Sequence, residues 1–218
     1  MPDNKKPKVQ EPMWPSLIAM VAAGVLHAAL PDHLALGPRW AVLGIVVALL
    51  LPGEVFHAMG KHRMCRVLGY VGISVVTVAM IGSVLLLLHA IPNHDVKPLQ
   101  LLHSATALWV TNVLVFAAWY WRLDAGGPHK RNMRNEHTNG AFLFPQMTID
   151  GPTDDPDDQK NWQPLFVDYL FLAFNTSTAL SPTDVPVLSR WAKVLMMVQA
   201  AISLTVVGLL AARAVNIL

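Results

Sequence analysis

The sequence has few charged residues and a single cysteine, and each shortage excludes a class of protein. Charged residues make up 14% of the chain, whereas ordinary soluble domains carry about 25%, so water is not the solvent for most of the folded surface. The net charge of +2 is too small to indicate nucleic acid as a partner. Because Cys65 is the only cysteine, an internal disulfide and a cysteine-based zinc site are excluded. It stands in "KHRMCR", which we expect to be a loop.

Catalytic and targeting motifs are also missing. The chain has no serine nucleophile elbow, no phosphate-cradling glycine loop and no HExxH motif, so we expect neither an enzyme nor a cofactor. The start, "MPDNKKPKVQEPMW", has no apolar run behind a short basic region. It therefore predicts a polar tail over residues 1–14 rather than a removable signal peptide.

Hydrophobic residues make up 54% of the chain and form long runs. A helix that crosses a bilayer needs about 20 mostly apolar residues. Four such runs predict a four-helix membrane region over residues 15–121, and they cover residues 15–30, 40–57, 67–91 and 99–121. The last run ends in "FAAWYW", where Trp119, Tyr120 and Trp121 are typical of a lipid headgroup interface.

A polar loop over residues 122–163 separates this region from a second one over residues 164–218. The second region predicts a short helix, a polar turn and a long C-terminal membrane helix. Residues 164–180 amount to about 25 Å of helix, which barely crosses a bilayer, so they form either a fifth span or a re-entrant hairpin. The fold class is therefore all-α, a polytopic integral membrane helix bundle with five or six hydrophobic segments and the re-entrant alternative open.

Basic residues alternate in number between the apolar runs. Three stand in the tail, one in the next loop, three in "KHRMCR", one in the following loop and five in the long loop. Because Lys and Arg prefer the cytoplasmic side, this predicts an inner (cytoplasmic) membrane protein with its N-terminus and long loop in the cytoplasm. Arg190 and Lys193 favour re-entry of residues 164–180 from the cytoplasm, whereas Arg213 favours a full span.

Hydroxyl groups and one carboxylate cluster between the last two apolar runs. Hydroxyls and freed carbonyls replace the hydration shell of an ion in channel filters, so the cluster is a candidate lining for a polar path. In the alternative interpretation it is a helix end and a turn, and Thr183 or Asp184 caps the next helix. The candidate residues are Asn175, Thr176, Ser177, Thr178, Ser181, Thr183 and Asp184.

Other polar residues lie inside the predicted spans. Gln199, Ser203 and Arg213 share one helix face by their spacing. With Asn112 and Asp168 they should face inward and pair, because a polar side chain facing lipid is costly. Such pairing forms either a polar pathway or hydrogen bonds that hold helices together.

Metal or haem binding is a third functional alternative. Glu54 and His57 have the Glu-x-x-His spacing of di-iron bundles, but the second copy that such sites need is missing. Four histidines lie in or near predicted helices, and their positions close to helix ends favour an interfacial role over haem ligation. They are His27, His57, His89 and His103.

Several long stretches carry a family resemblance: "LGPRW", "LWVTNVLVFAAWYWRLDAGGP", "FLFPQ", "FVDYLFLAFNTSTALSPTDV" and "RWAKVLMMVQ" with "ARAVNIL". They resemble a family of uncharacterised bacterial multi-span membrane proteins, a domain of unknown function, which implies the membrane fold and says nothing about activity. The part from Asp168 onward also distantly resembles the pore domain of tetrameric potassium channels, with Thr176, Thr178, Asp184 and Pro186 at matching places. It departs from that family at the filter, where "LSPT" replaces the Val-Gly-Tyr-Gly run, and without glycine the filter backbone is disfavoured.

The leading hypothesis from the sequence is a channel-like or pore-lining membrane protein, oligomeric, with the Asn175–Asp184 turn along a polar path. The alternative is a non-catalytic membrane scaffold or a subunit of a larger membrane complex. In either case the partners are the lipid bilayer and further protein subunits.

Overall fold

The computed structural model describes residues 12–90, 98–133, 140–148, 162–181 and 184–215. Within these ranges the chain is helical, no β-strand forms, and an isolated antiparallel bridge joins Phe142 to Val187. The long helices are α1 (Trp14–Ala28), α2 (Arg39–Ala58), α3 (His62–Ala90), α4 (Pro98–Leu123), α6 (Phe166–Thr178) and α7 (Arg190–Val215). The short ones are η1 (Asp32–Leu34), η2 (Asp124–Gly126), α5 (Pro128–Met133) and η3 (Pro145–Met147). The prediction of an all-α chain is thus confirmed.

In the part of the chain that the structure describes, three helical segments are long and apolar enough to cross a membrane: Arg63–Ala90, Leu99–Gly126 and Arg190–Ala212. Two shorter apolar helices, Trp14–Ala28 and Arg39–Gly53, lie beside them. These segments support a membrane location.

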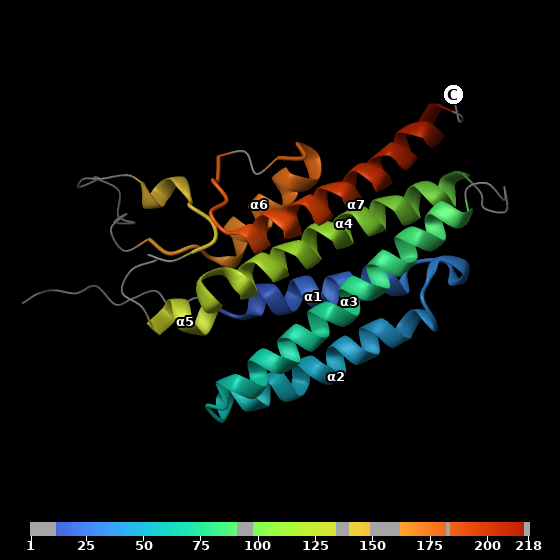
Figure 1. Cartoon of the computed structure of the whole chain (residues 1–218). Coiled ribbons are helices and arrows are strands. Elements are labelled where there is room, and N and C mark those ends of the chain that lie inside the picture. Colours follow the sequence, from blue (N-terminus) through green and yellow to red (C-terminus); the bar gives the residue numbers. More distant parts are fainter. Residues whose placement is uncertain (1–11, 91–97, 134–139, 149–161, 182–183, 216–218) are drawn as a thin grey trace, which may run out of the picture.

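The helices form one elongated bundle with two ends (Figure 1). We call the end where α4 finishes and α6 and α7 begin the loop end, and the opposite end the far end. Helices α1 and α3 run from the loop end to the far end, whereas α2 and α4 run back. Helix α4 lies at the centre and contacts α1, α3, α6 and α7.

The stretch "KHRMCR" is helical, which corrects the expectation of a loop. Helix α3 begins at His62, because Gly60 turns the chain with a φ of 70° and the amides of Met64 and Cys65 already bond to the carbonyl of Lys61. Cys65 therefore lies in the first turns of α3 and is buried.

An aromatic cluster closes the loop end. The ring of Phe142 lies 5.3 Å from that of Tyr120, 6.3 Å from that of Tyr169 and 6.1 Å from that of Trp191. Tyr120 and Trp121 are fully buried within the protein, so they do not form the headgroup belt that the sequence indicated. The reason is that Phe142, in a part of the predicted polar loop that folds back over this end of α4, packs against Tyr120, while Phe166 at the start of α6 packs against Trp121.

A buried carboxylate ties the same region together. Asp124 follows directly after α4, and its side chain accepts hydrogen bonds from the backbone amide of Ala141 and from the hydroxyl of Tyr169, the latter at 2.6 Å. Arg131 is also buried and donates to the carbonyls of Trp121 and Asp124, at 2.7 Å and 2.9 Å. Helix α4, helix α5, residue 141 and helix α6 are therefore joined by one set of polar contacts.

Replacement of this carboxylate should loosen the loop end. We expect Asp124→Ala to lower the free energy of unfolding by about 3 kcal/mol, because the Ala141 amide and the Tyr169 hydroxyl lose a charged acceptor while remaining buried. Thermal unfolding of the purified protein in detergent measures the change. The matched control is Asp184→Ala, whose side chain is exposed and which should change stability by less than about 0.5 kcal/mol. Equal stability of the two variants would contradict the role given to Asp124.

Candidate functional site

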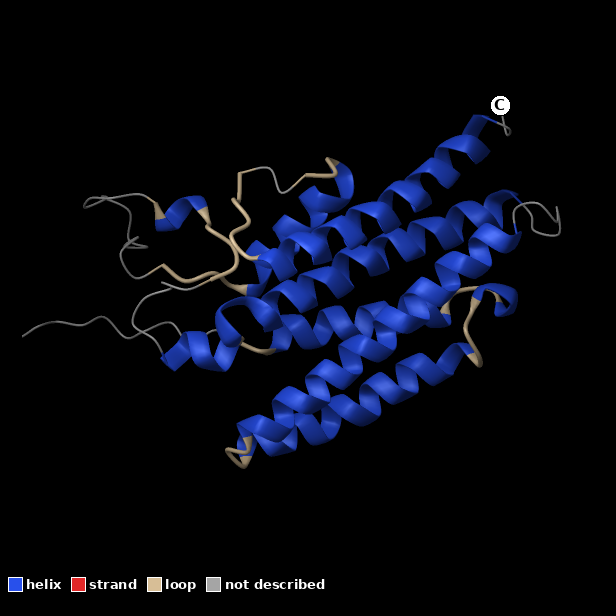
Figure 2. Cartoon of the chain, in the orientation of Figure 1, coloured by secondary structure: helices blue, strands red, loops and turns tan. Residues whose placement is uncertain are grey.

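The segment from residue 165 to residue 189 is a helical hairpin, which we call the α6 hairpin. Its two ends meet at the loop end, since Phe142 contacts both Tyr169 near the start of α6 and Trp191 near the start of α7. The segment that returns to the loop end, residues 184–189, pairs with residues 141–143, where the Leu143 amide bonds to the Pro186 carbonyl and the Leu188 amide to the Ala141 carbonyl, at 3.0 Å and 2.8 Å. Figure 2 shows these two stretches as tan loops at the loop end.

The tip of the α6 hairpin reaches the middle of the bundle. The carbonyl of Ser177, one residue before α6 ends, accepts a 2.6 Å hydrogen bond from Ser203. Ser203 lies about 20 Å along α7 from its first residue at 1.5 Å per residue, and α7 has 26 residues. Helix α6 therefore enters the bundle from the loop end and stops half-way (Figure 1).

Local sequence explains why α6 is short and lies where it does. Its buried residues recur at helical spacing on one face, which packs against α4 and α7. At its start, the carboxylate of Asp168 accepts a 2.7 Å hydrogen bond from the Leu165 amide, as in an N-terminal capping interaction. Just beyond its end, Leu180 has a φ of 54°, the left-handed conformation that terminates helices and that glycine usually occupies.

A network of mostly buried hydrogen bonds fastens the tip of α6 to α7. The amide nitrogen of Gln199 donates to the carbonyl of Ala173 at 2.7 Å and to the hydroxyl of Ser177 at 2.9 Å. Ser203, which bonds to the Ser177 carbonyl, accepts a 3.1 Å hydrogen bond from the indole of Trp109 on α4. Gln199 and Ser203 therefore share one buried face of α7, as the sequence predicted, and three helices meet at this point.

Helix α4 contributes two further polar groups to the network. The side-chain nitrogen of Asn112 donates to the carbonyl of Gln199 at 3.3 Å and lies 3.5 Å from the Ser177 hydroxyl. The hydroxyl of Tyr120 donates to the side-chain oxygen of Gln199. Asn112 thus faces inward as predicted, while its own side-chain oxygen has no hydrogen-bond partner among the described residues.

The structure divides the predicted hydroxyl cluster into two sets. Thr176 and Ser177 are buried against the bundle, and the Thr176 hydroxyl bonds to the carbonyl of Leu172 in its own helix. Thr178, Ser181 and Asp184 lie on the exposed side of the hairpin, with Asn175 between the two sets. Thr183 lies outside the described residues. The inward set anchors α6, and the outward set forms a polar surface at its tip.

Two predictions about single residues are wrong. Asp184 does not cap the last helix, because α7 begins only at Arg190 and the Ser189 hydroxyl accepts the bond from the Ala192 amide. Among the described residues Asp168 has no partner across the bundle, and the hydrogen bond that its carboxylate accepts comes from the backbone at the start of its own helix.

The metal and haem candidates find no common site in the described part of the chain. No group of three His, Cys, Asp or Glu residues there could hold a metal ion. The side chains of Glu54, His57 and Arg213 lie outside the described residues. His89 and His103 are exposed, whereas His27 is buried, which corrects the expectation that it reaches water.

Sequence reasoning missed Tyr120 and Trp109 as members of the network. Both are aromatic residues within an apolar run, where nothing in the sequence separates a hydrogen-bonding ring from a packing one. The spacing between Trp109, Asn112 and Tyr120 keeps them on neighbouring faces of α4, a signal that becomes visible only once α6 and α7 are known to cover those faces.

Loss of the central amide should release the tip of α6. We expect Gln199→Leu to destabilise the protein by about 1–2 kcal/mol, because the Ala173 carbonyl and the hydroxyls of Ser177 and Tyr120 lose a buried partner. A double-mutant cycle with Ser177→Ala should give a coupling of at least about 0.5 kcal/mol. Thermal unfolding in detergent measures both, and Thr178→Val serves as the control because that side chain is exposed. Additive effects of the two substitutions would contradict a shared network.

Comparison with known proteins places the chain in no group. No family model matches the sequence, and no match is found among curated proteins or among solved structures. The two family resemblances therefore stay predictions, and function has to be inferred from the geometry of the α6 hairpin and its surroundings.

Proposed function

We propose that the chain is a channel-like membrane protein with five crossings and one re-entrant hairpin, whose outward polar tip lines a path through a homo-oligomer. The crossings are α1, α2, α3, α4 and α7, and the re-entrant element is the α6 hairpin. The observation that carries the proposal is the half-way end of α6, with an exposed turn of polar side chains beside the middle of α7.

The physical argument rests on the backbone at the tip. If α7 crosses the bilayer, the residues after Thr178 lie near the depth of its midpoint, and they are not helical. Non-helical backbone at this depth persists only when it is buried in protein or lines water. The exposed position of Thr178, Ser181 and Asp184 therefore requires either a further subunit or a water-filled path at this place.

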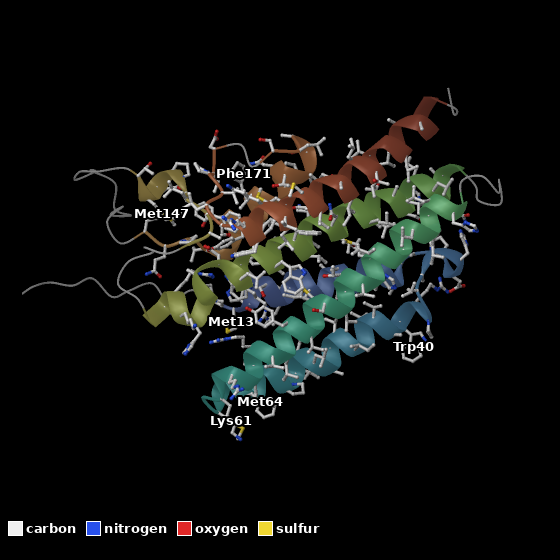
Figure 3. All side chains as sticks on the ribbon, in the orientation of Figure 1. Met13, Trp40, Lys61, Met64, Met147 and Phe171 are labelled. Carbon is white, nitrogen blue, oxygen red and sulfur yellow. The ribbon has the colours of Figure 1, made fainter. Side chains whose placement is uncertain are left out.

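The distribution of charge supports the orientation. Of the ten lysines and arginines in the described ranges, only Arg39 at the start of α2 and Arg213 near the end of α7 belong to the far end. Lys61 lies at the loop end (Figure 3). Because Lys and Arg accumulate on the cytoplasmic side, the loop end is cytoplasmic in our proposal and the hairpin enters from the cytoplasm. Arg190 and Lys193, in the first turn of α7, then lie on the cytoplasmic side together with the other basic residues of the loop end.

Exposed aromatic and aliphatic side chains fit a bilayer in the same orientation. Trp14 and Trp191 are exposed at helix starts on the loop end, and Trp40, which Figure 3 labels at the far end, has 72% of its surface exposed. Tryptophan at both ends of the spans is typical of membrane interfaces. On α6, the outward residues Val167 and Phe171 are apolar, so that side of the helix suits lipid or another subunit.

The polar path is therefore confined to the tip of the α6 hairpin and to the segment that returns from it to the loop end. A single tip presents only a few hydroxyls and one carboxylate, and it cannot surround an ion. In channels one element is repeated around an axis, so that rings of hydroxyls, carbonyls or carboxylates surround the ion and replace its hydration shell. In a homo-oligomer the Asp184 side chains would form such a negative ring, which favours cations.

The scaffold alternative is favoured by a different observation. The hydrogen bonds of the Gln199 and Ser203 side chains described above lead to other helices of the same chain, and such bonds hold a bundle together without any transport. On this alternative the exposed tip is covered by a different protein. The two functions differ in whether the purified chain alone conducts ions.

The membrane topology can be tested on intact cells. On a Cys65→Ser background, we expect Thr153→Cys and Ser189→Cys to be labelled only after the membrane is opened, because both would lie on the cytoplasmic side. A membrane-impermeant maleimide is the reagent. Pro38→Cys, which is exposed at the far end, is the control and should react from outside. Labelling of the first two positions from opposite sides would make residues 164–180 a full span and remove the re-entrant hairpin.

Conduction can be tested in proteoliposomes that contain the purified protein alone. We expect cation flux in the unaltered protein and a decrease of about tenfold or more in Thr178→Trp and Ser181→Trp, because a bulky ring would obstruct the path at the tip. Val167→Trp is the matched control, since it adds the same ring to the apolar outward side of α6 and should leave the flux unchanged. Absence of flux from a correctly folded, oligomeric preparation would defeat the channel and favour the scaffold.

A further inference from the structure

A second polar site lies at the far end of the bundle, away from the α6 hairpin. A cavity of about 640 Å³ opens there between the end of α1, the turn η1, the start of α2 and the first turns of α4. This volume falls within the range of about 300–1,000 Å³ that small-molecule sites occupy. The polar or charged residues that line it are Asp32, His33, Arg39, Gln100, His103 and Ser104.

The charged lining centres on Arg39. Its Nε donates to the carboxylate of Asp32 at 2.6 Å, and about half of the arginine side chain is exposed. Because this contact is made by Nε, both terminal amino groups stay available to an anion. Two amino groups in one plane match the oxygens of a phosphate or carboxylate.

Two imidazoles from different segments complete the lining. His33 comes from η1, and His103 comes from the second turn of α4. Each ring can donate a hydrogen bond to an anion. The remaining walls, which include Ala29, Leu30 and Ala107, are apolar, so the cavity suits an anionic group attached to a less polar body.

We propose that this far-end cavity binds an oxyanion of the phosphate type, either the headgroup of an anionic phospholipid or a soluble phosphate, with Arg39 as the main contact and His33 and His103 beside it. The site does not resemble a metal centre, because no suitable group of three ligands exists among the described residues. It is independent of the α6 hairpin, so that a failure of conduction and a failure of binding are separate results.

Arg39 is the main source of positive charge for an anion at the far end, because basic residues are scarce there. Among the lysines and arginines of the described residues, Arg39 and Arg213 belong to this end, and Arg39 lines the cavity. An anion near this end therefore has few other charged groups to bind.

Native mass spectrometry of the purified full-length chain in detergent can test the site, with phosphatidylglycerol as the probe. We expect one tightly bound lipid per chain and a loss of affinity of about tenfold or more in Arg39→Gln, since a charge-assisted pair contributes at least about 1.4 kcal/mol. His103→Gln should weaken binding less. Arg39→Lys keeps the charge but not the paired amino groups, so its affinity for the lipid should lie between the affinities of Arg39→Gln and His103→Gln.

Matched controls separate the site from general charge effects and from unfolding. Lys61→Gln removes an exposed cation at the opposite end of the bundle and should bind lipid as the unaltered protein does. Thermal unfolding without lipid should be nearly the same for Arg39→Gln, because an exposed ion pair contributes only about 0–1 kcal/mol.

Inorganic phosphate in a second series distinguishes the two sources of the anion. Displacement of the lipid by millimolar phosphate, with the same dependence on Arg39, would assign the site to a soluble phosphate. Retention of the lipid would assign it to a headgroup. Equal lipid binding by Arg39→Gln, His103→Gln and Lys61→Gln would overturn the proposal.

Discussion

The structure depends on one buried amide. Gln199 lies in the middle of the apolar part of α7, and its side chain bonds to a backbone carbonyl and a hydroxyl of α6 and to a hydroxyl of α4. A polar group in such surroundings must be satisfied within the protein. Helix α6 satisfies it only if its last turn lies beside the middle of α7, so the requirement of one side chain determines how far the α6 hairpin penetrates.

The loop end supplies the second constraint. Asp124, placed directly after α4, accepts hydrogen bonds from the amide of residue 141 and from Tyr169 of α6. Residues 141–143 pair in turn with the segment that returns from the tip of the α6 hairpin, through bonds to Pro186 and Leu188. The start and the end of the α6 hairpin are therefore both fixed to residues of the loop end. The chain has to come back to this end before α7 begins. The exposed hydroxyls at the tip follow from these two constraints together.

Much of the fold was visible in the sequence, because apolar runs of helical length have few alternatives. The predicted run 40–57 became α2 (Arg39–Ala58), and the run 99–121 became α4 (Pro98–Leu123). The pairing of Gln199 with Ser203 on one face also followed from spacing alone. Reasoning from local pattern failed at "KHRMCR", where a basic stretch turned out to be helical, and at residues 140–148, where a loop by composition became part of the core.

The sequence by itself determined that the chain is helical and apolar, with basic residues concentrated in alternate loops, since these properties depend on composition and order. Only the tertiary structure decided that the α6 hairpin begins and ends at the same end of the bundle. It also decided that Ser177 faces inward while Thr178 faces outward, and that Arg39 and His103 line one cavity. The physical reason is that each of these outcomes depends on partners far away along the chain. A polar side chain finds its partner in space, and the sequence around it does not record which helix will bring that partner near.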